Sequence, residues 1–240
     1  MADAIRQRPT SAGSIGILML ETSFERFVGD IGNARTWPFP VQYRIVKGAS
    51  PDRVTGPADA ALLAAFKAGA GDLVAAGVDG ITTTCGFLAL WQHELAAHVP
   101  VPVATSALLQ VPMVARMLPK GRRPAIFTFS AEALSDRHLI AVGVDPATPK
   151  FGMAPASAFQ RAIRTGDRSA SFATLRAEVL ATAERAVRAD PSIGALVLEC
   201  TNLTPYSAEL RQSLAMPIFD MVSLVHWFHR SLRPEAFAQD

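Results

Sequence analysis

The chain has 240 residues, of which 50% are hydrophobic and 18% are charged, so it is a globular chain able to bury one large core or two smaller ones. Its 23 basic and 21 acidic residues give a formal net charge of +2 and are scattered, which argues against a nucleic-acid-binding surface. No run approaches the roughly 18 apolar residues of a membrane helix, and no apolar segment follows a basic start. We therefore expect no membrane span and no secretory signal, and a protein of the reducing cytoplasm, where its two cysteines are better suited to remain thiols than to form a disulfide.

Apolar, β-branched runs alternate with helical patterns along the whole chain, which is typical of βα units and of a parallel sheet covered on both faces. We expect strands at residues 14–20, 41–46, 79–84, 101–105, 124–129, 194–198 and 217–219. We expect helices at residues 57–76, 86–97, 107–118, 131–142, 172–189 and 205–213, and a closing helix to about residue 232. The first of these has Pro57 at its first turn and Gly77 at its stop. The order of elements predicts an α/β fold.

One pattern occurs in both halves of the sequence. Asp79-Gly-Ile-Thr-Thr-Thr-Cys85-Gly-Phe-Leu and Ile193-Gly-Ala-Leu-Val-Leu-Glu-Cys200-Thr-Asn-Leu both run from a strand through a cysteine into a helix start. Each cysteine therefore falls at the carboxyl end of a parallel strand, where open α/β sheets place their ligand sites. The spacing predicts two lobes related by a pseudo-twofold axis, with both thiols in one cleft.

Two thiols placed in this way could move protons. Backbone N–H groups and the positive end of the helix dipole stabilise a thiolate at a helix start, so we expect the pKa of each thiol to fall toward working pH. A thiolate on one side of an acidic carbon can remove its proton while a thiol on the other side donates one. The same N–H groups could bind a carboxylate, with Thr84, Thr201 and Asn202 holding its oxygens and the charge of the carbanion.

Other interpretations of these residues stay open. A single cysteine at a strand end is more often a packing residue, although the matching contexts of the only two favour chemistry. Neither cysteine belongs to a Cys-X-X-Cys motif and no histidine is close in sequence, so we expect no metal there. His226 and His229 have a spacing that could bind a metal, although packing or an oligomer contact fits it better. Trp37 and Phe39 are interpreted as part of a lid or as a hydrophobic loop.

The two cysteine motifs resemble those of the aspartate/glutamate/hydantoin racemase superfamily, and the similarity runs from Ile15-Gly-Ile-Leu to about His226. Thr83-Thr-Cys85 and Leu198-Glu-Cys200-Thr-Asn202 match in order, spacing and strand-end context. Ala125-Ile-Phe-Thr128-Phe-Ser130 resembles the strand and hydroxyl-bearing turn that open the second lobe of the family.

The resemblance implies two similar α/β lobes, each a parallel sheet flanked by helices, with the substrate between them. We assign residues 13–104 and 206–233 to the lobe of Cys85, residues 105–205 to the lobe of Cys200, and residues 1–12 to a disordered tail. It also implies catalysis by the cysteine pair without pyridoxal phosphate or any other cofactor, and a homo-oligomer. Thr201, Asn202 and the backbone after Cys85 would contact the substrate carboxylate, and Thr128 and Ser130 are further binding candidates.

The sequence departs from glutamate racemases at the first motif. Those enzymes carry Cys-Asn-Thr, whereas this chain has Cys85-Gly86-Phe87, which offers backbone donors and an apolar wall. They also have an Asp-Ser pair closing the first strand, where this chain has Glu21-Thr22-Ser23 about two residues later. These differences favour a bulkier or less charged substrate, such as a hydantoin or a hydrophobic acid.

Two glutamates lie near the predicted site. Glu21 could orient a substrate ammonium or cap the turn that follows its strand. Glu199 adjoins Cys200, and because neighbouring strand residues point to opposite faces, we expect it to cap or bridge outside the cleft.

Our first hypothesis is a cofactor-independent racemase or epimerase that acts on an amino-acid-like or hydantoin-like molecule through Cys85 and Cys200. The resemblance leaves a decarboxylase or cis–trans isomerase, of the aryl malonate or maleate type, as a second class of function. A small-molecule-binding protein without catalysis is the third. All three take a small-molecule carboxylate or hydantoin-like ligand and need no nucleic-acid or membrane partner.

Overall fold

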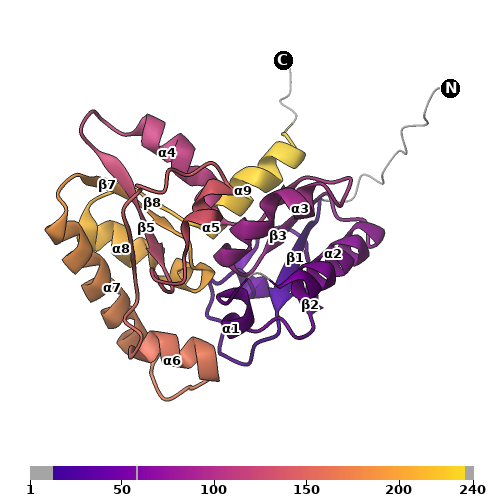
Figure 1. Ribbon diagram of the computed structural model, residues 1–240, viewed down its shortest axis with the longest axis horizontal. Coiled ribbons are helices and arrows are strands. Elements are labelled where there is room, and N and C mark those ends of the chain that lie inside the picture. Colours follow the sequence, from indigo (N-terminus) through magenta and orange to yellow (C-terminus); the bar gives the residue numbers. More distant parts are fainter. Residues whose placement is uncertain (1–12, 58, 236–240) are drawn as a thin grey trace.

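The computed structural model describes residues 13–57 and 59–235, and within them the chain forms two four-stranded sheets. The strand order is β2-β1-β3-β4 in the first sheet and β6-β5-β7-β8 in the second, and all neighbouring strands are parallel. The two sheets thus have the same topology, which confirms the predicted two-lobed α/β fold. Figure 1 shows the lobes side by side. The predicted tail at residues 1–12 lies outside the described residues.

The strands match the predicted runs closely, apart from one short strand that the sequence pattern missed, β6. Their bounds are β1 (Ile15–Leu20), β2 (Val41–Val46), β3 (Gly80–Thr83), β4 (Val103–Ala104), β5 (Arg123–Thr128), β6 (Lys150–Gly152), β7 (Ile193–Leu198) and β8 (Ile218–Phe219). The central strands are buried along almost their whole length, because helices cover both faces of each sheet.

The helices follow the predicted order, with α1 and α6 in addition. Their bounds are α1 (Pro51–Val54), α2 (Ala60–Ala75), α3 (Gln92–Ala96), α4 (Val111–Met117), α5 (Asp136–Ile140), α6 (Ala158–Thr165), α7 (Phe172–Ala189), α8 (Ser207–Leu214) and α9 (Met221–Leu232). Short 3-10 helices are η1 (Ala34–Thr36), η2 (Gly86–Trp91), η3 (Ala107–Gln110) and η4 (Thr201–Tyr206). Helix α2 begins at Ala60 rather than at Pro57, because the Asp59 side chain accepts the Leu62 backbone N–H at 2.9 Å and caps the helix there.

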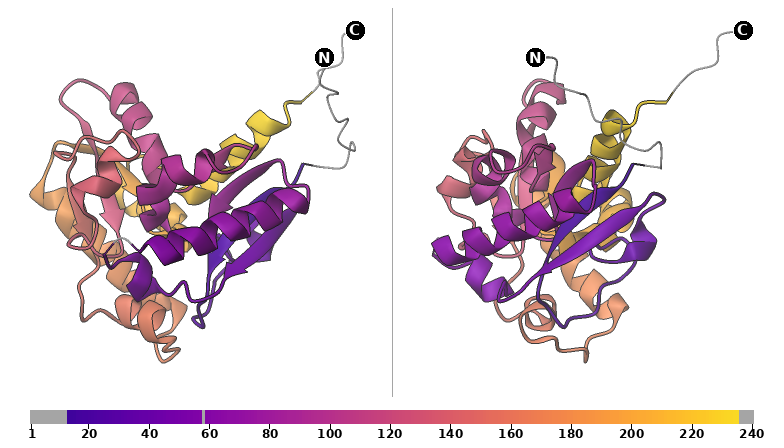
Figure 2. Two further views of the ribbon diagram at one scale, coloured as in Figure 1. Left: turned by 45° about the vertical axis from the view of Figure 1, so that its right-hand side comes forward. Right: turned by 90° about the vertical axis from the view of Figure 1, so that its right-hand side faces the viewer.

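Alternating residues of β1 pack on the two layers around the first sheet. Leu18 faces a core shared with Phe66 of α2, whereas Ile15 and Ile17 face the core that contains Phe228 of α9. Figure 2 shows α2 and α9 on different sides of this sheet. The second of these cores continues without a break into the other lobe, so the two lobes share buried packing.

The C-terminal segment divides between the lobes, which corrects the expected boundary at residue 206. Strand β8 pairs with β7 in the second sheet, and α8 packs on α7 of that lobe. Only α9 returns to the first lobe, where Phe228 and Leu232 lie against Gly80 of β3. Among the described residues, no helix is both long enough and apolar enough to cross a membrane.

Candidate active site

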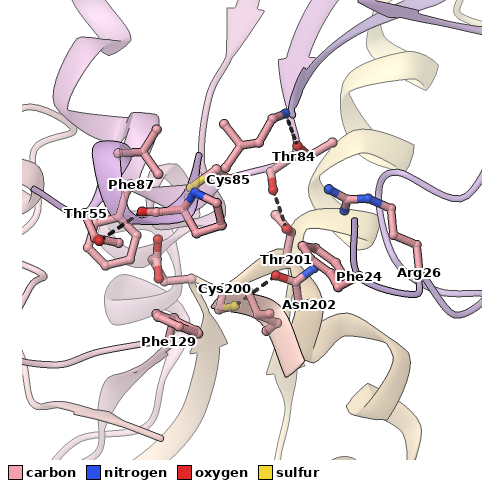
Figure 3. A pocket seen from close by; sticks show the side chains of 16 residues that line it. Phe24, Arg26, Thr55, Thr84, Cys85, Phe87, Phe129, Cys200, Thr201 and Asn202 are labelled. Atoms are coloured by element: carbon pink, nitrogen blue, oxygen red, sulfur yellow. Dashed lines mark hydrogen bonds between the residues drawn. The ribbon is translucent and has the colours of Figure 1, made fainter. Parts of the chain in front are cut away.

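Cys85 and Cys200 line the same cleft between the two lobes, together with the rings of Phe24, Phe87 and Phe129 (Figure 3). The cleft has about 420 Å³ of empty space, including its opening to solvent. Cys85 is partly exposed and Cys200 is buried, and both are free thiols. The predicted meeting of the two cysteines is therefore present in the structure.

The positions of both cysteines follow from where the strands end. Strand β3 ends at Thr83 and β7 at Leu198, and each cysteine occupies the N-cap position of the 3-10 helix that follows, η2 or η4, without a capping hydrogen bond from its side chain. The Thr83 hydroxyl accepts the backbone N–H of Cys85 at 3.3 Å and donates to the Thr105 carbonyl at 2.7 Å. These contacts fix the turn that carries Cys85.

Two of the predicted substrate-binding hydroxyls join the cysteine turns to each other. The Thr201 hydroxyl donates to the Thr84 carbonyl at 2.7 Å, across the boundary between lobes. The Thr84 hydroxyl accepts the backbone N–H of Leu20 at 3.2 Å. Both threonines line the cleft, but their side-chain hydroxyls form hydrogen bonds within the protein, which keep the turns that carry the two thiols together.

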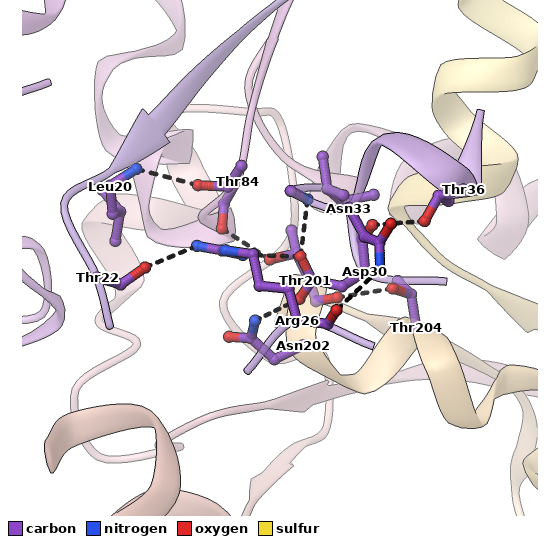
Figure 4. A network of polar contacts seen from close by, with 12 residues as sticks. Leu20, Thr22, Arg26, Asp30, Asn33, Thr36, Thr84, Thr201, Asn202 and Thr204 are labelled. Carbon is purple, nitrogen blue, oxygen red and sulfur yellow. Dashed lines mark hydrogen bonds and ion pairs between the residues drawn. The ribbon is translucent and has the colours of Figure 1, made fainter. Parts of the chain in front are cut away.

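Asn202 links Cys200 (Figure 3) to a buried ion pair in the first lobe (Figure 4). Its amide nitrogen donates to Asp30 Oδ2 at 2.6 Å, and its oxygen lies 3.8 Å from the Cys200 sulfur, which donates to it. Asp30 Oδ1 accepts from Arg26 Nη1 at 2.7 Å. The network ties the second cysteine motif to the loop after β1.

Arg26 is a cleft residue that the sequence analysis missed. Its side chain is 9% exposed and that of Asp30 is 3% exposed, so the ion pair is largely withdrawn from water. Its guanidinium lies 4.5 Å above the centre of the Phe24 ring, and Nη2 donates to the Thr22 hydroxyl at 3.0 Å. A Cβ at Gly32 would lie 2.6 Å from Arg26 Cδ, so glycine leaves the room that the arginine occupies. The sequence signal was an arginine and an aspartate four residues apart.

Glu199 lines the cleft, which corrects the expectation that it lies outside. Strand β7 ends at Leu198, so the alternation of side chains between the two faces of the sheet no longer fixes the direction of Glu199. Its side chain is fully buried, and Oε2 accepts the Thr128 hydroxyl at 2.5 Å. Thr128 therefore donates a hydrogen bond to Glu199, and Thr128 itself does not line the cleft.

Burial, and then the negative charge of Glu199, raises the pKa of Cys85 to about 12. The same two causes raise the pKa of Cys200 well above its ordinary value. The backbone N–H groups at the helix starts and the charge of Arg26 act in the opposite direction, but they are outweighed. The expected fall of both pKa values is therefore wrong. That expectation included the effect of the helix starts on the thiols, but not the effects of burial and of the Glu199 carboxylate.

Gly86 and Phe87 form part of the cleft wall as the sequence suggested. A Cβ at Gly86 would lie 2.2 Å from the Glu199 carbonyl oxygen and 2.3 Å from Glu199 Oε1, so only glycine allows the two cysteine motifs to approach this closely. The Phe87 ring stands edge-on to the buried His138 ring, with 5.3 Å between centres.

Two other predicted binding residues lie away from the cysteine cleft. The Ser130 hydroxyl accepts the Ala133 backbone N–H at 3.3 Å and caps the turn after β5. The Glu21 carboxylate accepts the Gly48 backbone N–H at 2.8 Å, so it caps the turn after β2 and not the expected turn after its own strand, β1.

The aromatic loop before β2 packs on the last helix. The Phe39 ring stacks on His229 with 3.9 Å between centres and meets His226 edge-on at 5.4 Å. Trp37 completes the cluster. In the part of the chain that the structure describes, no three His, Cys, Asp or Glu side chains are grouped to hold a metal ion.

The family model of Asp/Glu/hydantoin racemases matches residues 41–228, which is most of the chain and includes both cysteine motifs. The chain belongs to the Asp/Glu/hydantoin racemase family. This agrees with the resemblance seen in the sequence, and it makes the cleft between lobes a candidate enzyme active site.

Curated relatives of this racemase-family chain include dimethylsulfoniopropionate lyases. Dimethylsulfoniopropionate lyase 7 of Emiliania huxleyi is 31% identical over 91% of this chain and 67% of its own length. A dimethylsulfoniopropionate lyase of Durusdinium sp. clade D is 25% identical over 90% of this chain and 74% of its own. The chain thus spans about two thirds to three quarters of these two lyases.

Solved structures with the same fold include decarboxylases and racemases. A mutant of arylmalonate decarboxylase in a sulfate-associated form has a TM-score of 0.64 at 19% identity. The match covers 94% of this chain and 96% of the decarboxylase chain. A glutamate racemase from Bacillus anthracis has a TM-score of 0.60 at 16% identity over 92% of this chain and 83% of its own. At these identities the likeness shows the fold.

Proposed function

We propose that this protein is a lyase, which removes the Cα proton of a small carboxylate and releases the group held by the neighbouring carbon. One observation carries the proposal: Cys85 and Cys200 line a single cleft between the lobes. A pair of thiols in a cleft suits proton removal next to a carboxylate, which is the first step shared by racemization and elimination. The similarity to dimethylsulfoniopropionate lyases over nine-tenths of the chain favours elimination.

The substrate class that we propose is a 3-sulfoniopropionate, with dimethylsulfoniopropionate as its simplest member. A thiolate takes the proton from Cα, and the electron pair of that C–H bond forms the Cα–Cβ double bond. The Cβ–S bond breaks with its electrons on sulfur, so the products are acrylate and neutral dimethyl sulfide. The proton stays on the thiol until it is lost to solvent, and no redox partner or cofactor is consumed.

Cys85 is the better candidate for the base. The charge of Arg26 and the backbone N–H groups of Phe87 and Leu88 favour its thiolate, while a charge on Cys85 further opposes ionization of Cys200. Only one of the two thiols is therefore expected to ionise at a time. Arg26, which lies in the cleft wall, is positioned to bind the substrate carboxylate.

The proposal is tested by incubating the purified protein with dimethylsulfoniopropionate and measuring dimethyl sulfide in the headspace and acrylate in solution. We expect the two products in equal amounts, at a rate proportional to enzyme concentration. Absence of both products at millimolar substrate would refute the proposed substrate class.

Racemization is the second candidate, because the two thiols come from different lobes and so approach the cleft from different walls. A racemase would exchange the Cα hydrogen of a chiral acid or hydantoin with solvent deuterium and cause loss of optical rotation, without forming an alkene. A panel of such compounds in D₂O separates the two activities.

A further inference from the structure

Glu199 has an oxygen without a partner at the wall of the cleft. Its Oε2 accepts the Thr128 hydroxyl, but Oε1 is buried and has no hydrogen-bond partner. Among the described residues, it is the one buried side-chain nitrogen or oxygen atom that lacks a hydrogen bond. Burying a carboxylate oxygen without a partner is costly, and a bound ion or a catalytic role is among the reasons for which proteins keep such a group. Glu199 is also fully buried, so bulk water does not compensate for it.

The surroundings of Glu199 suit a cation that has no hydrogen-bond donors. Phe24, Phe87 and Phe129 line the same cleft. Two of these rings already have an arginine over one face: Arg26 lies 4.5 Å from the centre of Phe24, and Arg164 lies 5.4 Å from the centre of Phe129. Aromatic faces attract cations through the ring quadrupole, most strongly when the cation is removed from water. A sulfonium or quaternary ammonium group has no N–H to donate, so it is recognised by a negative charge and by aromatic faces, and this cleft contains both.

We propose that Glu199 and the rings around it form the binding site for the cationic onium group of the substrate. This inference rests on the proposed lyase function and specifies the part of the substrate that the cleft recognises. Arg26 would hold the carboxylate and Glu199 the onium, so that a zwitterionic substrate places its acidic Cα and its departing group between two charges of opposite sign.

Such a site would also couple recognition to catalysis. The charge of Glu199 opposes ionization of both thiols. A bound cation offsets that charge, so the thiolate of Cys85 becomes easier to form when the onium group is in place. After elimination the sulfide is neutral and no longer pairs with Glu199, which favours its release.

The test uses two ligands of the same shape. 3-(Trimethylammonio)propionate and 4,4-dimethylpentanoate differ only in a positive nitrogen against a neutral carbon, and both have the carboxylate. Isothermal titration calorimetry at pH 8 should show the ammonium ligand binding wild-type protein at least about tenfold more tightly. Equal affinity, or tighter binding of the neutral ligand, would overturn the proposal without any variant.

Glu199→Gln assigns the preference to this residue, because glutamine keeps the shape and can still pair with Thr128. We expect the tenfold preference to disappear in this variant, while Glu94→Gln, on the exposed surface of α3, keeps it. A preference that survives in Glu199→Gln would assign cation binding elsewhere and contradict the proposal. Circular dichroism confirms that each variant is folded.

The binding experiment fails or succeeds independently of the lyase assay. A protein that prefers the ammonium ligand but releases no dimethyl sulfide would retain the cation site and refute the lyase. A protein that releases dimethyl sulfide but binds both ligands equally would retain the lyase and refute the cation site.

Discussion

Glu199→Gln is expected to change how the stability of the protein depends on pH. Burial raises the pKa of Glu199 from 4.5 to about 7, with opposition from the Thr128 hydroxyl and the Phe129 backbone N–H. Between these two pH values the folded protein holds a proton that the unfolded chain has released. The stability of the folded protein therefore falls as pH rises from 4.5 to about 7. Below and above this window, Glu199 causes no further change of stability with pH.

The size of the effect follows from the two pKa values. One pKa unit corresponds to about 1.4 kcal/mol, so the charged, buried Glu199 costs about 3 kcal/mol of folding free energy at pH 8. Glutamine has no proton to lose and lacks this cost. Relative to the wild type, Glu199→Gln should thus gain about 3 kcal/mol between pH 4.5 and pH 8.

Urea unfolding in reducing buffer at several pH values from 4.5 to 8 measures this difference directly. Glu94→Gln should follow the wild type at every pH, because Glu94 is exposed on α3. Contributions of the histidines are common to all three proteins and cancel in the comparison. A difference between Glu199→Gln and wild type that stays constant with pH, to within about 0.5 kcal/mol, would refute the raised pKa of Glu199.

Three further results are expected. Gly86→Ala should lower stability by about 1–3 kcal/mol in urea unfolding, because its Cβ collides with Glu199, and wild-type stability would contradict the close approach of the two motifs. Arg26→Met should cost about 3–5 kcal/mol in the same assay by leaving the Asp30 carboxylate buried without its partner, and a loss below about 1 kcal/mol would show the pair to be unimportant. Cys85 should react slowly with iodoacetamide at pH 8, followed by mass spectrometry, and faster in Glu199→Gln; unchanged rates would exclude the effect of the carboxylate on the thiol.

The cysteine cleft could be predicted because its signal is local. A buried strand followed at once by a cysteine and a helix start occurs twice, and parallel strands end at the same edge of a sheet. Apolar, β-branched runs are also local signals, and they predict seven of the eight strands. They do not reveal β6, because three residues show almost no periodicity.

The charged part of the site could not be predicted in the same way. Strand alternation predicts the wrong side for Glu199, because β7 ends one residue earlier, at Leu198. Arg26 and Asp30 come from a loop after β1, and only the folded chain brings that loop to Asn202. The thiol pKa values also depend on burial and on this carboxylate, which are tertiary properties.

The central claim, that the Cys85 thiolate removes the Cα proton of the substrate, is tested most directly by the rate of dimethyl sulfide release in Cys85→Ser, with Cys200→Ser measured beside it. A serine hydroxyl is nearly isosteric with a thiol but is a far weaker acid, so Cys85→Ser should remain folded and lose at least about a hundredfold in rate, a larger loss than in Cys200→Ser. Release at the wild-type rate by Cys85→Ser would contradict the claim.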